Sequence, residues 1–119
     1  MGFFRRRSVE KHRKPLIQFV CEQDGESERH LKSSLEKVLR LSPKVERAYL
    51  CRVSYGDLNS LDVALCVRCP SGSSRRLARQ VHTVFASQFG SDQHLDIIFL
   101  ADDQETDVAK VSKPFYQAV

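Results

Sequence analysis

The sequence lacks the long apolar runs that carry proteins into or across membranes. No window comes near the ~18 unbroken apolar residues that a membrane-spanning helix needs. The two phenylalanines at positions 3–4 are too few for the apolar core of a secretory signal. Four cysteines without such a signal predict free thiols in a reducing compartment. We therefore expect a cytoplasmic protein of one domain, because 119 residues can bury a core without disulfides or metal.

The short motifs of common enzyme classes are also missing. The sequence contains no G-x-S-x-G, no phosphate-binding G-x-x-x-x-G-K and no dinucleotide-binding G-x-G-x-x-G. Its histidines, His12, His30, His82 and His94, have no Ser or Cys partner at a recognisable spacing. We expect no catalytic residues and a protein that is not an enzyme, with a small-molecule sensor as an alternative class.

One Cys-x-x-Cys, from Cys66 to Cys69, is the pattern nearest to a metal or redox site. It ends a run with strand alternation, and residues three apart in a strand point to opposite faces of the sheet. The two sulfur atoms then cannot share a metal without a bulge, and no second Cys-x-x-Cys completes a tetrahedral site. We expect structural cysteines, no metal and no cofactor.

The net charge of +4 comes from the start of the chain. Residues 1–14 have a net charge of +5, whereas residues 15–119 have a net charge of −1. Residues 1–14 show no apolar period and are followed by Pro15, so we expect a flexible basic tail, 1–14, and a folded domain, 15–119. The basic residues of the tail are Arg5, Arg6, Arg7, Lys11, Arg13 and Lys14.

Such a tail would contact phosphates without reading sequence, or an anionic membrane at ~1 kcal/mol per basic residue. Phe3 and Phe4 add a weak membrane signal, and Arg6 stands where N-myristoylation requires Ser or Thr. No strand carries the aromatic RNA-recognition pattern. A weak nucleic-acid or membrane-surface binder is therefore the alternative function, against a tail that only aids solubility.

Two segments place apolar residues at helical spacing. The first follows Ser27, an expected N-cap, and ends at Pro43, since the residue before a proline is pushed out of the helical region. The second runs from the serine-rich turn at 70–74 to Gly90 and carries a strong apolar stripe.

A shorter helix is predicted from Asp102 to about Val111, because Asp102 with Glu105 three residues later resembles a capping box. Four further segments have the β-branched, aromatic or alternating character of strands. They are residues 15–22, 45–55, 61–69 and 94–100.

The resulting order is β-α-β-β-α-β with a short C-terminal helix. It predicts an α+β, two-layer sandwich of the ferredoxin-like kind, with two helices on one face of a four-stranded antiparallel sheet. Right-handed crossovers would place the first and third strands in the middle. Sequence order alone does not determine pairing, so other strand orders stay open.

A two-layer sandwich leaves one face of its sheet open. If odd positions face the helices, the open face is unusually apolar for a wetted surface and predicts a cover. That cover would be the final segment with Phe115 and Tyr116, a second copy of the chain, or a protein partner. The residues expected on this face or beside it are Gln18, Val20, Ala64, Cys66, Arg68, Asp96, Ile98, Tyr49 and Leu50.

Arg75, Arg76 and Arg79 occupy the first turns of the second helix, where the helix dipole repels cations. Helix propensity therefore does not explain them. Next to the turn at 70–74, they are candidates for contact with a phosphate, a carboxylate or an acidic partner. The alternative is a solvated helix face.

Three stretches, VERAYLCRVSYGD (45–57), LDIIFLADDQETDVAKV (95–111) and KPFYQAV (113–119), resemble the C-terminal domain of the bacterial enhanced-serine-sensitivity (SseB) protein family. The resemblance covers roughly residues 15–119 and suggests a free-standing version of this domain. The matching residues are Pro43, Val45, Ala48, Tyr49, Leu50, Leu95, Asp96, Leu100, Pro114, Phe115 and Tyr116.

The resemblance implies a bacterial cytoplasmic accessory protein, loosely connected with serine sensitivity, that acts by binding. The matching residues are aliphatic or aromatic, so none transfers a catalytic role. We accordingly expect a non-enzymatic interaction module that uses the open sheet face and the three arginines. Its partner would be another protein or a second copy of the chain.

Overall fold

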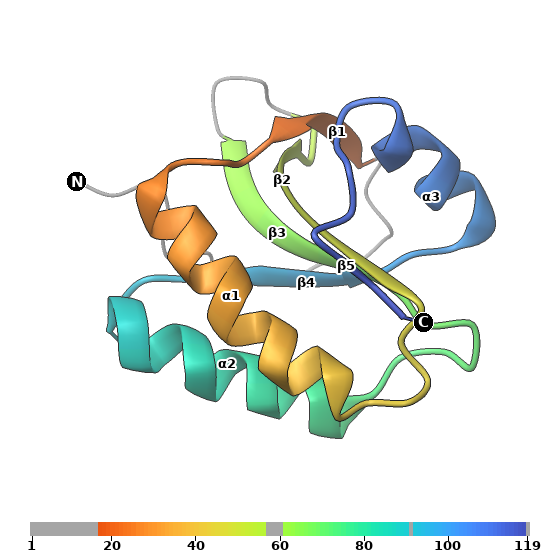
Figure 1. Ribbon diagram of the computed structural model, residues 1–119. Coiled ribbons are helices and arrows are strands. Elements are labelled where there is room, and N and C mark those ends of the chain that lie inside the picture. Colours follow the sequence, from red (N-terminus) through yellow and green to blue (C-terminus); the bar gives the residue numbers. More distant parts are fainter. Residues whose placement is uncertain (1–16, 57–60, 91, 119) are drawn as a thin grey trace.

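The computed structural model describes residues 17–56, 61–90 and 92–118 (Figure 1). They form a mixed α+β domain of three helices and a five-stranded sheet within these residues, which confirms the expected general class. In chain order the elements are β1 (Gln18–Glu22), α1 (Glu26–Arg40), β2 (Arg47–Ser54), β3 (Leu61–Arg68), α2 (Arg75–Phe89), β4 (Asp96–Phe99), α3 (Asp102–Ala109) and β5 (Tyr116–Gln117).

The sheet has the order β1-β2-β3-β4, and β5 also pairs with β2. β2 is antiparallel to β1, β3 and β5, whereas β3 and β4 are parallel. The expected ferredoxin-like order, with the first and third strands central, is therefore not the one adopted. The reason is that α1 connects β1 to β2, which are antiparallel neighbours. Of α1 and α2, only α2 makes a crossover between parallel strands, from β3 to β4.

α1 and α2 lie side by side on one face of the sheet (Figure 1). Their apolar stripes pack against the β2–β3 hairpin, and β3 alternates as its sequence predicts, with Val63, Leu65 and Val67 facing these helices. The helices contribute Leu31, Leu35, Leu39, Leu77, Val81 and Phe85 to this first apolar cluster.

α3 lies on the other face of the sheet (Figure 1) and adds a partial third layer, which a two-layer sandwich does not have. Val108 of α3 packs into a second apolar cluster that is separate from the first. The other buried members of this cluster are Phe19, Tyr49, Cys51, Val53, Ala64, Cys66, Ile98 and Leu100.

β1 faces the opposite way from the sequence-based expectation. Phe19 packs on the α3 side, because it pairs directly with Val53 and paired residues of antiparallel strands share a face. A bulge between Phe19 and Cys21 then shifts the register of the strand.

The helix starts differ from the sequence-based prediction at α1. Its N-cap is Gly25, so Ser27 lies inside the first turn. Glu28 reaches back and its Oε1 accepts a hydrogen bond of 2.9 Å from the Gly25 N–H. At α2 the serine-rich turn that was expected before the helix supplies the cap, since the Ser74 hydroxyl accepts from the Leu77 N–H at 3.1 Å.

α3 begins with a different pair from the one expected. Its N-cap is Ala101, whose N–H donates to Oε1 of Gln104 at 2.9 Å. The predicted cap between Asp102 and Glu105 is therefore not formed. Glu105 is left free to turn toward the sheet, and this decides how α3 is attached.

Candidate functional site

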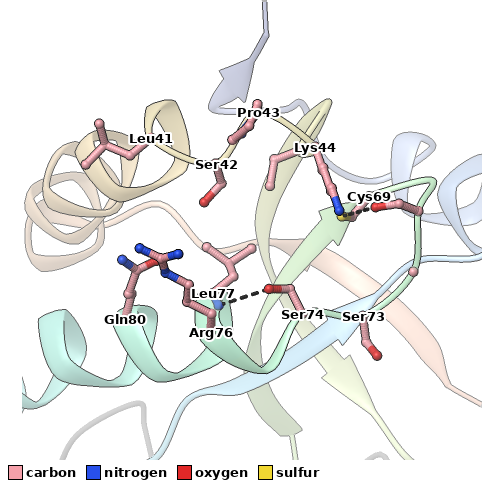
Figure 2. Close-up of a pocket in the computed structure, with 13 residues that line it drawn as sticks. Leu41, Ser42, Pro43, Lys44, Cys69, Ser73, Ser74, Arg76, Leu77 and Gln80 are labelled. Carbon is pink, nitrogen blue, oxygen red and sulfur yellow. Dashed lines mark hydrogen bonds between the residues drawn. The ribbon is translucent and has the colours of Figure 1, made fainter.

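A pocket of about 570 Å³ opens between the end of α1 and the start of α2 (Figure 2). Its deeper wall is made by Val45, Cys69 and Leu77, each at most 6% exposed and each part of the first apolar cluster. The floor of the pocket is therefore part of the core, whereas its outer residues lie on α2 and on two loops.

The outer part of the pocket is polar and basic. Lys44 lies on the α1–β2 connection, and Arg76 and Gln80 project from α2 on the facing wall (Figure 2). Ser71 and Ser73 of the β3–α2 loop add hydroxyl groups. Among the described residues that line the pocket, both charged side chains are cations, so the pocket has positive potential.

Leu41 stands at the mouth of this pocket and is 78% exposed. Among the described residues it is the one large apolar side chain that is so exposed. A single exposed leucine is common on proteins. Beside a basic pocket, however, it offers an apolar contact next to charge.

The three arginines singled out in the sequence are exposed on the first turns of α2. No carboxylate in the described ranges forms an ion pair with Arg75, Arg76, Arg79 or Lys44. Other basic residues do pair, as Lys32 does with Glu22 at 3.1 Å. The structure thus joins the arginines to the pocket through Arg76, while Arg75 and Arg79 lie beside it.

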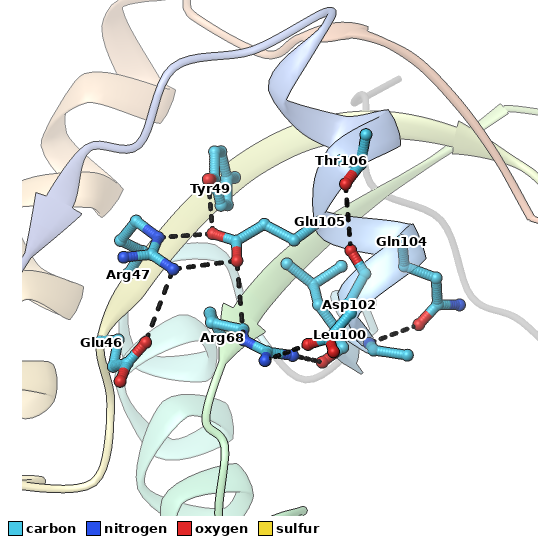
Figure 3. Close-up of polar contacts among 10 residues, drawn as sticks. Glu46, Arg47, Tyr49, Arg68, Leu100, Asp102, Gln104, Glu105 and Thr106 are labelled. Carbon is cyan, nitrogen blue, oxygen red and sulfur yellow. Dashed lines mark hydrogen bonds and ion pairs between the residues drawn. The ribbon is translucent and has the colours of Figure 1, made fainter.

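A second polar cluster attaches α3 to the sheet (Figure 3). Glu105 Oε1 accepts from Arg47 Nη2 at 2.9 Å, and Glu105 Oε2 accepts from the Tyr49 hydroxyl at 2.8 Å and also from Arg47 Nε. Arg68 lies 3.5 Å from the same carboxylate and pairs with Asp102. One carboxylate of α3 is thus held by three side chains of the two central strands.

The protonation states in this cluster follow from its geometry. The Arg47 hydrogen bond holds the pKa of Glu105 below its ordinary value, against the opposing effect of burial, and the Tyr49 hydrogen bond adds to the lowering. Burial and the bond to Glu105 raise the pKa of Tyr49 to about 12. At neutral pH Glu105 is therefore a carboxylate and Tyr49 a phenol, so the cluster stabilises the fold and is not poised for proton transfer.

The sheet face that was expected to be open is covered. Tyr49, Ala64 and Cys66 are at most 3% exposed and Ile98 is 9% exposed, while Leu50 is buried on the α1/α2 side. These residues do not form an accessible surface in this structure. Of the expected open-face set, Gln18 is exposed and Val20, Arg68 and Asp96 are half-buried.

The cover is α3, because it carries Val108 and Glu105 to this face. The final segment does not provide it. Tyr116 belongs to the first apolar cluster and Phe115 packs against the same cluster.

The cysteines behave as the strand pattern predicts. Cys66 lies in the second apolar cluster and Cys69 in the first, on opposite faces of the sheet, and all four cysteines are free. Sγ of Cys66 is 3.7 Å from Sγ of Cys51; this contact and burial raise the pKa of the Cys66 thiol. Within the described ranges no three His, Cys, Asp or Glu side chains are grouped so as to hold a metal ion.

The tail residues Arg5, Arg6, Arg7, Lys11, Arg13 and Lys14, with His12, lie outside the described residues. His30 and His82 are exposed, and His94 contacts Asp96, which also accepts from Tyr55. None of the helices in the described part of the chain is long and apolar enough to cross a membrane.

Sequence reasoning missed Lys44 and gave Glu105 a different role, as half of a helix cap. Lys44 follows a proline in a loop, and nothing local indicates that it faces α2. Ala101 and Gln104 have the same capping spacing as Asp102 and Glu105, so the sequence allows a helix start that does not use Glu105, but nothing local indicates the contact of Glu105 with Arg47.

Fold and site together define a small α+β domain with a basic pocket at one end and a helix clamped over its second sheet face. The chain belongs to the SseB protein C-terminal domain family, whose sequence profile matches residues 18–118. This confirms the resemblance seen in the sequence. A search of curated proteins and a search of solved structures returned no match.

Most residues that carry the family resemblance have a structural role. Their apolar members fill the two clusters on either side of the sheet, and Pro43 lines the pocket. The buried members are Val45, Ala48, Tyr49, Leu50, Leu95, Leu100 and Tyr116, while Asp96, Pro114 and Phe115 are half-buried.

Proposed function

We propose that this chain is a non-enzymatic interaction module that binds an acidic, partly apolar segment of a partner protein at the start of α2. The observation that carries the proposal is the basic pocket, whose charged lining residues, Lys44 and Arg76, have no carboxylate partner in the described part of the chain. Exposed cations without a carboxylate partner in the fold are available for charge-assisted hydrogen bonds to the carboxylates of a ligand. Leu41 at the pocket mouth supports an apolar side chain next to the acidic one.

This proposal moves the binding surface from the sheet face to the end of the domain. The four free thiols support a reducing compartment such as the cytoplasm. Arg75 and Arg79 would act at longer range by steering an acidic segment toward the pocket, an effect that salt weakens.

The test uses a fluorescein-labelled peptide of alternating Glu and Leu, with a Gln and Leu peptide as its uncharged counterpart. Binding to the full chain is followed by fluorescence anisotropy in low and in high salt. The variant Arg75→Glu/Arg76→Glu/Arg79→Glu should abolish binding of the acidic peptide. The matched variant Arg29→Glu/Lys37→Glu/Arg40→Glu makes the same charge change on α1 and should retain most of it.

A further variant separates the apolar contact from the charge. Leu41→Ser should weaken binding of the acidic peptide in high salt, where electrostatic attraction is screened and apolar contact is not. If the α1 and α2 charge variants lost peptide binding equally, the pocket would not be the binding site, because the net charge of the chain alone would then explain the binding.

The alternative function, a weak nucleic-acid or membrane-surface binder, rests on the +5 charge of residues 1–14. Deleting these residues separates the two proposals. If the deletion removes binding to single-stranded RNA and to anionic vesicles while acidic-peptide binding is kept, the tail has its own separate activity. If it removes all binding, the folded surface is not the site.

A further inference from the structure

α3 is attached to the domain by little apolar contact. α1 buries Leu31, Leu35 and Leu39 along one stripe, whereas Val108 is the one buried residue of the eight in α3. Isolated helices of this length are unstable in water, so α3 depends on what it contacts. Its main polar contact with the sheet is the carboxylate of Glu105, which accepts hydrogen bonds from Arg47 and Tyr49.

The groups that hold Glu105 do not come from α3. Arg47 and Tyr49 belong to β2 and Arg68 to β3, the two central strands of the sheet. These strands are fixed by their pairing and by the α1/α2 layer. The three side chains would therefore still converge on one point above the sheet if α3 moved away. Arg68 would lose both of its carboxylate contacts, and Arg47 would keep only its 3.5 Å contact with Glu46.

The surface next to this point is apolar. Val108, one helical turn after Glu105, packs into the cluster that contains Cys51, Cys66 and Ile98. The sheet face thus combines a group of side chains that binds one carboxylate with an apolar patch. The two lie one helical turn apart along α3. α3 fits it because it carries an acid and an aliphatic side chain at that spacing.

We propose that α3 is an internal ligand on this face. The face is a binding site for a helical segment that carries a carboxylate and, three residues later, an aliphatic side chain, and α3 occupies the site until such a segment displaces it. Charge complementarity to Arg47 and Arg68 and the apolar patch around Cys66 define this partner. The site is separate from the basic pocket and does not depend on the function proposed for it.

The first test measures hydrogen exchange in the full chain. Glu105→Gln keeps the shape of the side chain but removes the charge that faces Arg47, Tyr49 and Arg68. The α3 amides should then exchange about tenfold faster or more, while α1 and α2 stay unchanged, because α3 opens as its own unit. Asp103→Asn removes an exposed acid of the same first turn, so it should accelerate α3 exchange only about twofold through the helix dipole and leave α1 and α2 unchanged. Unchanged α3 exchange, or equal acceleration throughout the domain, would overturn the proposal.

The second test supplies the ligand from outside. The peptide ADDQETDVAKV, which is the sequence of residues 101–111, is added to the Glu105→Gln chain and backbone amide chemical shifts are followed. Saturable shifts are expected for Tyr49, Cys66 and Arg68, and none for the pocket residues Lys44 and Arg76. The counterpart peptide ADDQQTDVAKV should produce no saturable shifts. Equal responses to both peptides, or none to either, would show that the face does not recognise this pattern.

Discussion

Replacing Glu28 with alanine should lower the free energy of unfolding by about 3 kcal/mol, since it removes a buried hydrogen-bonded carboxylate. Glu28 is 1% exposed at the start of α1. Its Oε1 accepts from the Gly25 N–H at 2.9 Å and its Oε2 accepts from Gln23 Nε2 at 3.2 Å. Each bond to a charged acceptor contributes roughly 1.5–3 kcal/mol, and relief of the buried charge offsets part of the sum.

The glutamine variant shows which bond matters. Glu28→Gln keeps an oxygen for Gly25 but presents an N–H₂ group to the N–H₂ of Gln23. Gln23 cannot turn its oxygen to meet it without losing the 2.8 Å bond that this oxygen accepts from Arg52 Nε. We expect Glu28→Gln to cost about 1 kcal/mol, the value of one hydrogen bond. Glu26→Gln, an exposed change in the same turn, should cost about 0.5 kcal/mol through the helix dipole.

Urea unfolding followed by circular dichroism and by tyrosine fluorescence gives these free energies. For a domain of this size, a loss of 3 kcal/mol corresponds to a fall in Tm of roughly 10–15 °C. The reasoning would be refuted if Glu28→Ala cost no more than Glu26→Gln. It would also be refuted if Glu28→Gln cost as much as Glu28→Ala.

Three further predictions concern other parts of the chain. Glu105 has a folded-state pKa below its unfolded value of 4.5, so its stabilising effect is complete above pH 4.5 and is lost as the pH falls through the lower value. Urea unfolding at stepped pH should therefore show a steeper acid loss for the wild type than for Glu105→Gln, and parallel curves would contradict this. With a thiol reagent under native conditions, only exposed Cys21 should react quickly, and fast reaction of buried Cys66 would show that α3 does not seal its face. Ser74→Ala should cost about 1 kcal/mol of stability through loss of the α2 cap, with exposed Ser73→Ala as a neutral control.

The local elements of this fold are readable from the sequence, whereas their pairing is not. Alternation in β3 and the apolar stripes of α1 and α2 are short-range patterns, and the structure contains them within a few residues of the expected bounds. Which strand β1 joins depends on contacts between distant segments. A helix between two strands is compatible with a parallel crossover or with an antiparallel return, and the apolar pattern is the same for both.

The sequence could indicate a residue of the candidate site only where that residue type is unfavourable at its position in the predicted helix or strand. Arg75, Arg76 and Arg79 stand out because cations are unfavourable at a helix start. Glu105 was hidden for the opposite reason: an acid at a helix start looks fully explained by the dipole, so its contact with Arg47, far away in sequence, has no local signal. Lys44 likewise becomes part of the pocket only when the α1–β2 connection folds against α2.

The arrangement of β1 and β5 also bears on self-association. Both strands pair with β2, one with residues 51–54 and the other with residues 47–48, so this border of the sheet is built from two short pieces, one of them bulged. A border of this kind is a poor template for an incoming strand, which leaves β4 as the better docking edge in the described part of the chain. Molecules joined edge to edge would then stop at pairs, because growth into a filament requires two receptive sides.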